Sequence, residues 1–528
     1  MSVSSVWHIS REYRGLAEAG GIKDVVRDLA ETLASYGIRI SVVIPWYGLM
    51  DRLRIAYREL PLSFDIPLPD RGRRSAVERI GVRLYELSNV SVYCLTSARF
   101  SEKLGVYTYT DREASDDPRT VRGEGHTDAL ELGLLFQLGA LELISSFGDP
   151  PSVIHCHDAH AAFVPPMMRE HPSYREFFKG SGAVVTIHNA GPEYRQDVRD
   201  IEYLANASGI PTRALCDGMC DGAVNPFLVA SRYAVLTTVS ENYAKELLET
   251  DDVSFSGGLG RALRERSIVL HGITNGITLS YLDPRTPAFS GLPAGYDPSS
   301  DDLSGKAVCR RIFLERLASG RLPPALELFG SLDDSAAGPL YALQARITRQ
   351  KGIRQLIEAA ELLRRSGAGV RIAVLGQGEE PLERVLIRTA QSPEFAGSFC
   401  FIRGYQEAFV KLLFAAGDFF LIPSVYEPCG ITDLFAQLTG TIPVVHRVGG
   451  LVKVVEGENG YTYDENTPET LASAIARSAE DFRHRPEKLA ALRKNGFSIV
   501  TGRYTWDRIA KTGYLPLYEA SRIGTVRR

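Results

Sequence analysis

Residues 418–451 constrain the fold of this chain most strongly, because they read as strand, loop, helix, strand and loop in succession. Residues 419–423 are a short apolar run of the kind that forms a buried parallel strand, and 442–445 are the next such run. A turn-rich loop with one acid, Glu427, lies between them. Loops at the carboxyl ends of strands line the ligand crevice of an open α/β sheet, so this loop is a candidate site.

The two loops of this stretch combine a carboxylate with glycines and a new helix N-terminus, which we expect at Gly430 and which runs to about Leu438. Free N–H groups at a helix N-terminus bind anions. An acid beside an anion site suggests a phosphorylated sugar, with a diphosphate on the amides and hydroxyls on the carboxylate. An ordinary strand–helix turn with a solvated Glu427 fits the same pattern. The candidate donor-binding residues are Gly430, Ile431, Thr432, Gly449 and Gly450.

The motif at 427–432, EPCGIT, followed by GGL at 449–451, resembles the signature of bacterial glycogen synthases and plant starch synthases. These are retaining glucosyltransferases of the GT-B fold. The resemblance implies an α/β protein with two doubly wound Rossmann-like domains and an interdomain cleft. Strand-like runs that alternate with helical patterns from residue 340 onward independently predict a parallel sheet in the second half.

A length of 528 residues suggests two domains. We expect an N-terminal acceptor-side catalytic domain over 1–283, joined by the C-terminal helix 505–528, and a nucleotide-sugar donor-binding domain over 303–504. Residues 283–302 hold four prolines and read as a linker. Residues 322–338 and the polar stretch 110–126 are predicted to be loops, and 65–121 to be irregular with strands near 83–87 and 90–95.

Composition narrows the class of protein. The chain is 44% apolar and 23% charged with a net charge of −4, so nothing points to nucleic acid or to an anionic membrane. No apolar run approaches the roughly 18 residues of a membrane helix, and the start lacks the regions of a signal peptide. The seven scattered cysteines fit reduced thiols, and Cys216 and Cys220 are expected to be structural. We therefore expect a cytoplasmic protein.

The first βαβ unit is predicted from a strand at 6–10, a helix at 20–36 and a strand at 39–45, with Gly20 and Gly21 at the phosphate-facing turn. The family typically carries Lys-x-Gly-Gly-Leu here, where the Lys reaches the donor phosphates, but this chain has Glu18. A carboxylate should repel a diphosphate. Either Glu18 turns to solvent, or a nearby base substitutes, or activity or donor preference has changed. The candidate bases are Arg11, Arg14 and Lys23.

A histidine-rich segment follows the strand predicted at 152–156. Three histidines and an acid within six residues, His155, His157, Asp158 and His160, could form a metal site. The alternation argues against metal, because His155 and His157 leave the strand on one side, while Asp158 is placed to cap the next helix. The segment also resembles the family's His-x-His-Asp-x-His element, which implies that His160 hydrogen-bonds the transferred glucose.

Two further segments of the first half match family patterns to different degrees. The strand predicted at 183–187 ends in His188 and Asn189, which match Thr-x-His-Asn at the cleft edge and are candidate donor-binding residues. Asp128 resembles the start of an acceptor-binding Asp-Asn-x-x-Arg-Phe segment. Ala129 and Leu132 replace its Asn and Arg, so a role for Asp128 in acceptor binding does not follow.

Arg346 and Lys351 follow the first strand of the second half, in the stretch RITRQKG. Two cations five residues apart at a strand's carboxyl end can grip one diphosphate, since Arg offers a planar fork and Lys a point charge. The stretch resembles the family's Arg-Leu-x-x-Gln-Lys-Gly, which implies that both are donor-phosphate cations.

These patterns together predict a hexosyltransferase, a glycogen or starch synthase that moves glucose with retention from ADP-glucose to the non-reducing end of an α-1,4-glucan. The predicted catalytic residues are Glu427, Arg346, Lys351 and His160. We expect no metal and no cofactor, since ADP-glucose is a substrate, and glycogen as the acceptor. One alternative is a GT-B transferase that uses UDP-glucose or another acceptor. Another is a catalytically weak glucan-binding or regulatory paralogue, suggested by Glu18 and by the isolated Asp128.

Overall fold

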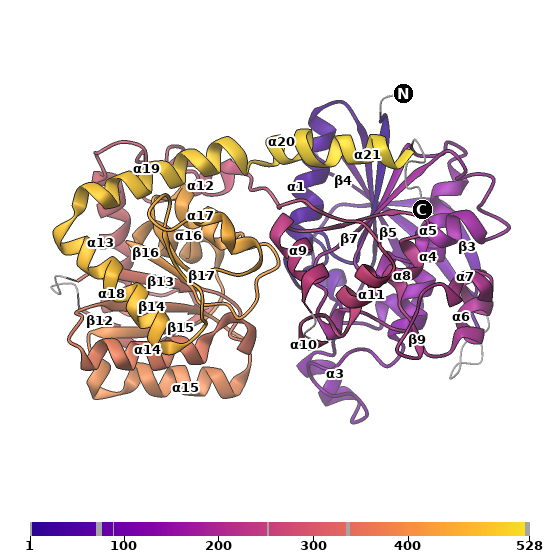
Figure 1. Cartoon of the computed structure of the whole chain (residues 1–528). Coiled ribbons are helices and arrows are strands. Elements are labelled where there is room, and N and C mark those ends of the chain that lie inside the picture. The colour runs from indigo at the N-terminus through magenta and orange to yellow at the C-terminus, as the bar shows by residue number, and fades with distance from the viewer. Residues whose placement is uncertain (1–2, 70–76, 88, 251–252, 334–337, 523–528) are drawn as a thin grey trace. The chain divides into compact units, whose positions relative to one another are not determined.

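The computed structural model describes residues 3–69, 77–87, 89–250, 253–333 and 338–522. It contains two compact units (Figure 1): residues 1–274 with 509–528 form unit 1, and residues 275–508 form unit 2. Parts of the loops predicted at 65–121 and 322–338, and the end of the predicted C-terminal helix, lie outside the described residues. Among the residues described, the seven cysteines are free.

Unit 1 is built on a nine-stranded sheet in the order β11-β10-β7-β6-β1-β2-β5-β4-β3. Strands β11 to β5 pair in parallel, whereas β3 and β4 add an antiparallel extension. The sequence predicted only part of this extension, because β3 alternates polar and apolar residues along an exposed edge. The strands are β1 (Ser5–Ile9), β2 (Arg39–Pro45), β3 (Arg58–Pro67), β4 (Val77–Leu87), β5 (Val90–Thr96), β6 (Val153–His157), β7 (Gly182–Ile187), β10 (Val235–Thr238) and β11 (Leu270–Gly272).

Helices of unit 1 connect these strands in the right order for a doubly wound sheet. In α1 the apolar side chains Val25, Val26, Leu29 and Leu33 recur at helical spacing and are buried, as predicted. The stretch 110–126 is not all loop, because α3 begins with a capping box between Thr110 and Glu113. The helices are α1 (Ile22–Ser35), α2 (Ala98–Ser101), α3 (Asp111–Asp116), α4 (Ala129–Ser146), α5 (Val164–Glu170), α6 (Ile201–Ser208), α7 (Thr212–Cys216), α8 (Pro226–Ala230), α9 (Glu241–Glu249), α10 (Val253–Ser256), α11 (Leu259–Glu265) and α21 (Leu515–Arg522).

Helix α4 corrects the expectation that no segment approaches a membrane helix. Its 18 residues are long and apolar enough by length and composition. Most of this helix is buried inside unit 1, where it packs against α5 and the sheet. A buried core helix is apolar on all sides for the same reason as a membrane helix, so its composition reflects packing.

Unit 2 is built on a seven-stranded sheet in the order β12-β15-β14-β13-β16-β17-β18. All pairs are parallel except β12 with β15. The sequence placed a loop at 322–338, but β12 forms an antiparallel edge strand there. The strands are β12 (Leu326–Leu332), β13 (Leu340–Gln344), β14 (Arg371–Gly376), β15 (Ser398–Gly404), β16 (Phe419–Ile422), β17 (Ile442–His446) and β18 (Tyr461–Tyr463).

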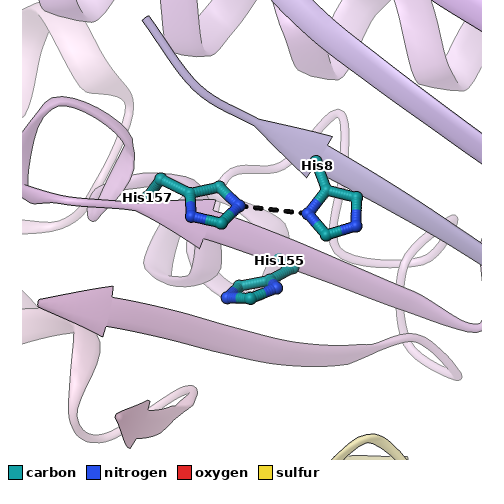
Figure 2. A group of neighbouring side chains, drawn as sticks. All are labelled: His8, His155 and His157. Atoms are coloured by element: carbon teal, nitrogen blue, oxygen red, sulfur yellow. Dashed lines mark hydrogen bonds between the residues drawn. The ribbon is translucent and has the colours of Figure 1, made fainter. Parts of the chain in front are cut away.

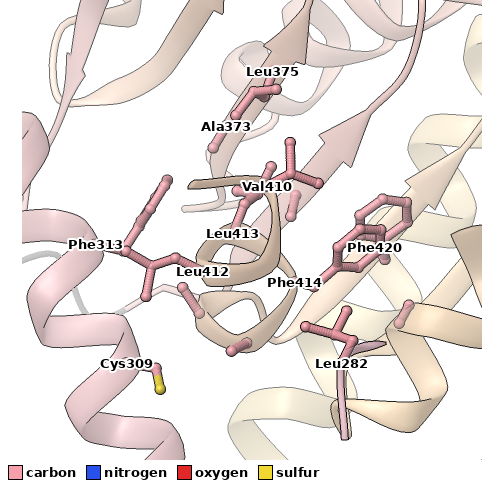
Figure 3. Packing of buried hydrophobic residues seen from close by; sticks show 14 of the residues in the cluster. Leu282, Cys309, Phe313, Ala373, Leu375, Val410, Leu412, Leu413, Phe414 and Phe420 are labelled. Carbon is pink, nitrogen blue, oxygen red and sulfur yellow. The ribbon is translucent and has the colours of Figure 1, made fainter. Parts of the chain in front are cut away.

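The core of unit 2 covers both faces of this sheet. Alternate residues of β13 point to opposite sides: Leu340 and Ala342 join one apolar cluster, and Tyr341 and Leu343 join the other. Figure 3 shows part of the first cluster, where the rings of Phe414 and Phe420 stack 4.5 Å apart. The helices are α12 (Pro287–Ser290), α13 (Ser304–Ala318), α14 (Ile353–Arg365), α15 (Glu380–Gln391), α16 (Glu407–Ala416), α17 (Thr432–Leu438), α18 (Pro468–His484) and α19 (Pro486–Arg503).

The predicted linker at 283–302 is part of the packed body of unit 2. Leu292 and Tyr296 are buried in its core, and the Tyr296 hydroxyl donates to the carbonyl of Thr439. After α19 the chain continues through α20 (Trp506–Ile509) and a π-helical turn at Ala510–Tyr514 into α21, which packs on β6 and β7 of unit 1.

Both sheets share one strand order around the first strand of their parallel part, β1 in unit 1 and β13 in unit 2, and this order positions the candidate site. In unit 1 the chain leaves β1 toward β2 on one side and later returns to β6 on the other. In unit 2, β13 lies between β14 and β16 in the same way. Ligands of doubly wound sheets bind at this reversal, outside the carboxyl ends of the two central strands. The loops after β1, β6, β13 and β16 are therefore the candidate ligand-binding loops.

Candidate functional site

The loops after β13 and β16 are cross-linked through their backbones. The N–H of Val425 donates to the carbonyl of Gln350 at 2.8 Å, and the Gln350 side chain donates to the carbonyl of Tyr426. Gly352 has a φ of +68°, and a Cβ there would lie 1.8 Å from the carbonyl oxygen of Pro423. Only glycine permits this approach. The contact brings the residue before it, Lys351, beside the second loop.

Lys351 and Glu427 form an ion pair, with Nζ and Oε2 2.6 Å apart. The hydroxyl of Ser424 donates to the same carboxylate oxygen at 2.9 Å. Burial alone would raise the pKa of Glu427, but the charge and hydrogen bond of Lys351 lower it below the ordinary value. Glu427 is thus held as a carboxylate at the switch point of the sheet.

Arg346 differs from Lys351 in its surroundings. Its side chain is exposed, and within the described ranges no hydrogen bond or ion pair engages it. Because Lys351 is already paired with a carboxylate, the exposed Arg346 and Arg349 are the cations of this loop that are available to an anion.

The first turn of α17 and the Gly449–Gly450 turn have different roles. In the part of the chain that the structure describes, the backbone N–H groups of Gly430, Ile431 and Thr432 donate to no protein acceptor. The N–H of Gly450 already donates to the carbonyl of Glu427 at 2.9 Å. A Cβ at Gly449 would lie 2.0 Å from the Glu427 carbonyl oxygen. The glycine pair therefore lets two loops pack together, and the amides of α17 remain the candidate anion site.

The sequence reading missed a buried ion pair that joins these loops. Asp433, in the first turn of α17, is fully buried and lies 3.1 Å from Nζ of Lys453. The same ammonium donates to the carbonyls of Cys429, Gly430 and Gly450. Burial raises the pKa of Asp433 to about 6, against the opposing charge of Lys453. Nothing in the periodicity of α17 marks Asp433, because its position falls on the apolar face.

The turn at Gly20 and Gly21 in unit 1 is occupied by the protein's own carboxylate. Glu12, which is buried, accepts the N–H groups of Ala19 at 3.1 Å and Gly20 at 2.5 Å. Burial raises the pKa of Glu12, while the Gly20 hydrogen bond lowers it. The predicted phosphate contact at Gly20 would compete with this carboxylate, whereas Gly21 is exposed.

Glu18, the acid at the family's lysine position, is exposed, and its carboxylate accepts the N–H of Gly15 at 2.6 Å. This matches the first of the three possibilities raised from the sequence. Two of the proposed substitute bases are paired with acids on α1: Arg14 with Asp24 and Asp28, and Lys23 with Asp24. The third, Arg11, is buried, and it contacts the next candidate residue.

His160 follows β6 and is buried in a cage of side chains. Its Nδ1 lies 3.3 Å from Nη1 of Arg11, and its ring stacks on Tyr107 at 5.0 Å between centroids. The side-chain amide of Gln196 lies 3.4 Å from its Nε2. Burial, followed by the charge of Arg11, lowers the pKa of His160 well below its usual range. His160 is therefore a neutral hydrogen-bonding group.

Asp158 does not cap a helix, which corrects the expectation from sequence. Its backbone has φ +62° and ψ −179°, a region that costs a non-glycine residue energy and clusters at functional sites. Its carboxylate accepts the N–H of His188 at 2.7 Å. Burial raises the pKa of Asp158 to about 7. Asn189 accepts the N–H of Gly191, so Asp158 and Asn189 together shape the turn after β7.

His8, His155 and His157 form a buried group on β1 and β6, and one nitrogen from each lies within 4.8 Å of the others (Figure 2). This trio shares two residues with the metal alternative raised from the sequence but not His160. Nδ1 of His8 pairs with Nε2 of His157 at 3.0 Å, and Nδ1 of His157 pairs with His188. Both nitrogens of His155 are engaged, by the Tyr518 and Thr186 hydroxyls. A metal would have to displace these bonds, so the trio fits a hydrogen-bonded core better than a metal centre.

Asp128 also has a structural environment. It pairs with the buried Arg99 at 2.9 Å and with Lys103 at 2.7 Å. Burial would raise its pKa, but the hydrogen bond and charge of Lys103 lower it. These ion pairs give the Asp128 carboxylate a structural role that does not require an acceptor sugar.

Comparison with known proteins agrees with this architecture. Residues 5–265 match the family model described as starch synthase catalytic domain, and 336–498 match that of glycosyl transferases group 1. A glycogen synthase of Aeromonas salmonicida is 27% identical over 97% of this chain and 97% of its own length. One of Geotalea daltonii is 28% identical over 95% and 96%. The catalytic domain of starch synthase IV from Arabidopsis thaliana, bound to ADP and acarbose, matches with a TM-score of 0.79 at 24% identity, over 99% of this chain and all of that one.

Two Rossmann-like units, together with the match of the second half to glycosyl transferases group 1, identify a glycosyltransferase of the GT-B fold. The matches over both halves make the class more specific, since they comprise a synthase catalytic model in the first half and a transferase model in the second. The chain belongs to the glycogen synthase and starch synthase family and is a hexosyltransferase, as the sequence motifs predicted.

Proposed function

We propose that the protein transfers glucose, with retention, from ADP-glucose to the non-reducing end of an α-1,4-glucan in the cytoplasm. The family implies a nucleotide-sugar donor and a glucan acceptor. The observation that carries the proposal is the arrangement of Arg346, Lys351 and Glu427 on two cross-linked loops. ADP as the nucleotide is supported by the ADP bound to the starch synthase IV domain.

Chemistry at this site would be electrostatic. Bond cleavage builds negative charge on the leaving diphosphate, and preorganised cations and amide dipoles stabilise that charge. Arg346 is exposed and unpaired in the part of unit 2 that the structure describes, and Lys351 has further N–H groups beyond the one held by Glu427. The backbone N–H groups of Gly430 to Thr432 add to the positive potential that the diphosphate would meet.

Glu427 would interact with the sugar, whereas the cations interact with the diphosphate. Its carboxylate is kept ionised by Lys351, so it can accept hydrogen bonds from the hydroxyl groups of the transferred sugar. It can also stabilise the positive charge that develops on the sugar ring. The family resemblance implies that the neutral His160 also hydrogen-bonds the transferred glucose. The fixed cations provide the charge that a metal ion would otherwise supply, so we propose a reaction without metal or cofactor.

The test is incorporation of radiolabelled glucose from ADP-glucose and from UDP-glucose, side by side, on a glycogen primer and on small sugar acceptors. We expect label in glycogen with ADP-glucose as the better donor. Label from UDP-glucose alone, or in a small acceptor alone, would replace the proposed substrate. No label with glycogen binding retained would favour the non-catalytic paralogue. Retention of Arg346, Lys351 and Glu427 together argues against that outcome.

A further inference from the structure

Arg11 lies in the loop after β1 and is buried, although it carries a permanent charge. Its Nε donates to the Tyr47 hydroxyl at 2.7 Å, and Nη2 donates to the carbonyl of Val106. Its guanidinium also lies over the rings of Tyr47 and Tyr107, 5.6 and 5.2 Å from their centroids. These contacts fix the direction in which Nη1 points.

Nη1 of Arg11 points at Nδ1 of His160, 3.3 Å away. Arginine has only donors, so the hydrogen lies on the guanidinium and His160 Nδ1 must offer a lone pair. A neutral imidazole has one donor and one acceptor, which leaves the ring proton on Nε2. The stacked Tyr107 ring, at 21° to the imidazole, prevents the ring from turning to exchange the two nitrogens.

We propose that Arg11 is a positioning residue that fixes the buried His160 in its Nε2–H tautomer, so that His160 acts toward the sugar only as a hydrogen-bond donor. This inference rests on the proposed function for the identity of the ligand, but the tautomer itself does not depend on it. It excludes His160 as a general base, because its only lone pair faces a cation.

Gln196 marks the place that the sugar oxygen would take. Its side-chain amide is 3.4 Å from Nε2 of His160, and its backbone has a φ of +53°, which is unusual for a residue with a side chain. In the structure the amide nitrogen of Gln196 faces Nε2. An Nε2–H donor needs the amide oxygen there, so the proposal requires the side-chain amide of Gln196 to be flipped by 180°. A sugar hydroxyl that displaces Gln196 would accept the same N–H.

The charged and titratable groups near His160 come from three loops. Arg11 contacts it from the loop after β1, and Tyr107 from the segment after α2. Glu12 accepts the Tyr107 hydroxyl at 2.9 Å, and the charges of Glu12 and Asp158 act on Tyr107. Arg11 is the one of these groups that both bonds to the imidazole and opposes its protonation. Removal of the guanidinium should therefore release the tautomer, whereas burial, the larger cause of the low pKa of His160, still disfavours the charged form.

Two variants of the full-length protein test whether the Arg11 donor fixes the tautomer of His160. Arg11→Gln keeps an N–H donor without the charge, whereas Arg11→Met keeps bulk with neither. Arg27→Gln is the control, since Arg27 pairs with Glu31 on α1 and does not contact His160. The readout is the 15N spectrum of histidine-labelled protein between pH 8 and pH 5.5, with the His160 signals assigned by their loss in His160→Gln. Circular dichroism and thermal unfolding verify folding.

We expect the wild-type protein and Arg27→Gln to show His160 as Nε2–H with no change over this pH range. Arg11→Gln should keep that tautomer because it keeps an N–H donor to Nδ1, and Arg11→Met should show both tautomers. An Nδ1–H signal in the wild type, or wild-type signals in a folded Arg11→Met, would overturn the proposal. If Arg11→Met does not fold, the wild-type spectrum decides: an Nε2–H tautomer supports the proposal and an Nδ1–H tautomer overturns it.

Turnover gives a second readout. We expect Arg11→Met to lower kcat by about 10- to 100-fold while KM for the nucleotide sugar changes little, because a misoriented contact acts on the reacting geometry. Arg11→Gln should lose less of kcat than Arg11→Met, because it keeps a donor to Nδ1. A wild-type protein that shows the expected tautomer but no glucosyl transfer would refute the proposed function and leave the tautomer assignment standing.

Discussion

Nζ of Lys351 and Oε2 of Glu427 lie 2.6 Å apart, so the cation and the carboxylate that the sequence assigned to different parts of the donor neutralise each other in the free protein. An ammonium has three donors, and Glu427 uses one of them. Lys351 can therefore bind a phosphate oxygen without releasing Glu427. The pair sets the position of both groups before the donor arrives, which is how preorganisation lowers a barrier.

Replacing either partner of this pair should be costly for turnover. We expect Lys351→Ala and Glu427→Ala each to reduce kcat by about 10²–10³, since each removes one preorganised charge contact. The double variant should lose less than the product of the two, because the groups act as a unit. Arg349→Ala, in the same turn and exposed, is the control. Near-normal rates in both single variants would refute the site assignment.

Arg346→Ala should separate catalysis from stability. We expect a loss of kcat of about 10²–10³. The free energy of unfolding should change by no more than about 0.5 kcal/mol, because Arg346 is exposed and no described residue pairs with it. Lys351→Ala should instead destabilise the protein by about 1–3 kcal/mol, since it leaves Glu427 without its charged partner. Urea unfolding beside steady-state kinetics measures both, and equal destabilisation by the two variants would contradict this account.

The buried pair of Asp433 and Lys453 should be essential to the fold of unit 2. Lys453→Met leaves a fully buried carboxylate unpaired, which costs about 3–5 kcal/mol. The pKa of Asp433 in the folded state, about 6, exceeds its ordinary value of 3.8. Protonation therefore favours the folded state, and the loss should be smaller at pH 5 than at pH 8. Lys494→Met, whose partner Asp301 is exposed, is the control. A loss that does not depend on pH would show that Asp433 is not the group left behind.

The sequence was sufficient for the elements that are apolar and short. The strands predicted at 39–45 and 442–445 agree with β2 and β17 to within a residue, since buried parallel strands are continuous apolar runs. β12 was taken for a loop because an antiparallel edge strand has no such run and its pairing with β15 is not local. The linker at 283–302 failed for a related reason, because its two core residues, Leu292 and Tyr296, lie among prolines, glycines and aspartates that are typical of loops.

The candidate site, like the fold, could be predicted only in part from the sequence. Arg346, Lys351 and Glu427 could be named from the sequence, because the loops after parallel strands converge at one edge of a sheet. The ion pair between Lys351 and Glu427 could not be predicted, because it depends on how closely Gly352 approaches Pro423 in the folded chain. Occupation of the Gly20 amide by Glu12 was equally hidden, because nothing local distinguishes that acid from a solvated one.

Buried histidines should make the protein less stable as the pH falls. Burial lowers the pKa of His8 and His188 to about 3 and that of His155 and His157 well below the usual range. The unfolded chain then binds protons below pH 6.5 that the folded state does not, so stability is full above that pH and falls below it. Each such histidine contributes about 1.4 kcal/mol per pH unit. In urea unfolding at pH 7.5, 6.0 and 5.5, His8→Asn should lower the slope by about one proton, and the exposed His484→Asn should not. Equal slopes would contradict neutral burial of His8.

Glu18 offers the most direct test of how this chain departs from its relatives. Its carboxylate is exposed and bonds only to the N–H of Gly15 among the contacts described, so a lysine can replace it without disturbing packing. A change from negative to positive charge near a diphosphate should improve kcat/KM for ADP-glucose by about five- to tenfold, most strongly at low salt. Glu176→Lys, on an exposed part of unit 1, controls for net charge.

The same experiment decides whether another base has taken over the lysine's task. If Glu18→Lys gives no improvement while Arg14→Gln or Lys23→Gln loses activity, that base already serves the donor, and its ion pair with α1 must open when the donor binds. If Glu18→Lys gives no improvement and both neutral variants keep full activity, Arg11 remains as the only candidate, and its contact with His160 predicts loss of kcat rather than of donor affinity. A folded Arg11→Met with unchanged kcat would then show that compensation by a neighbouring base is the wrong idea.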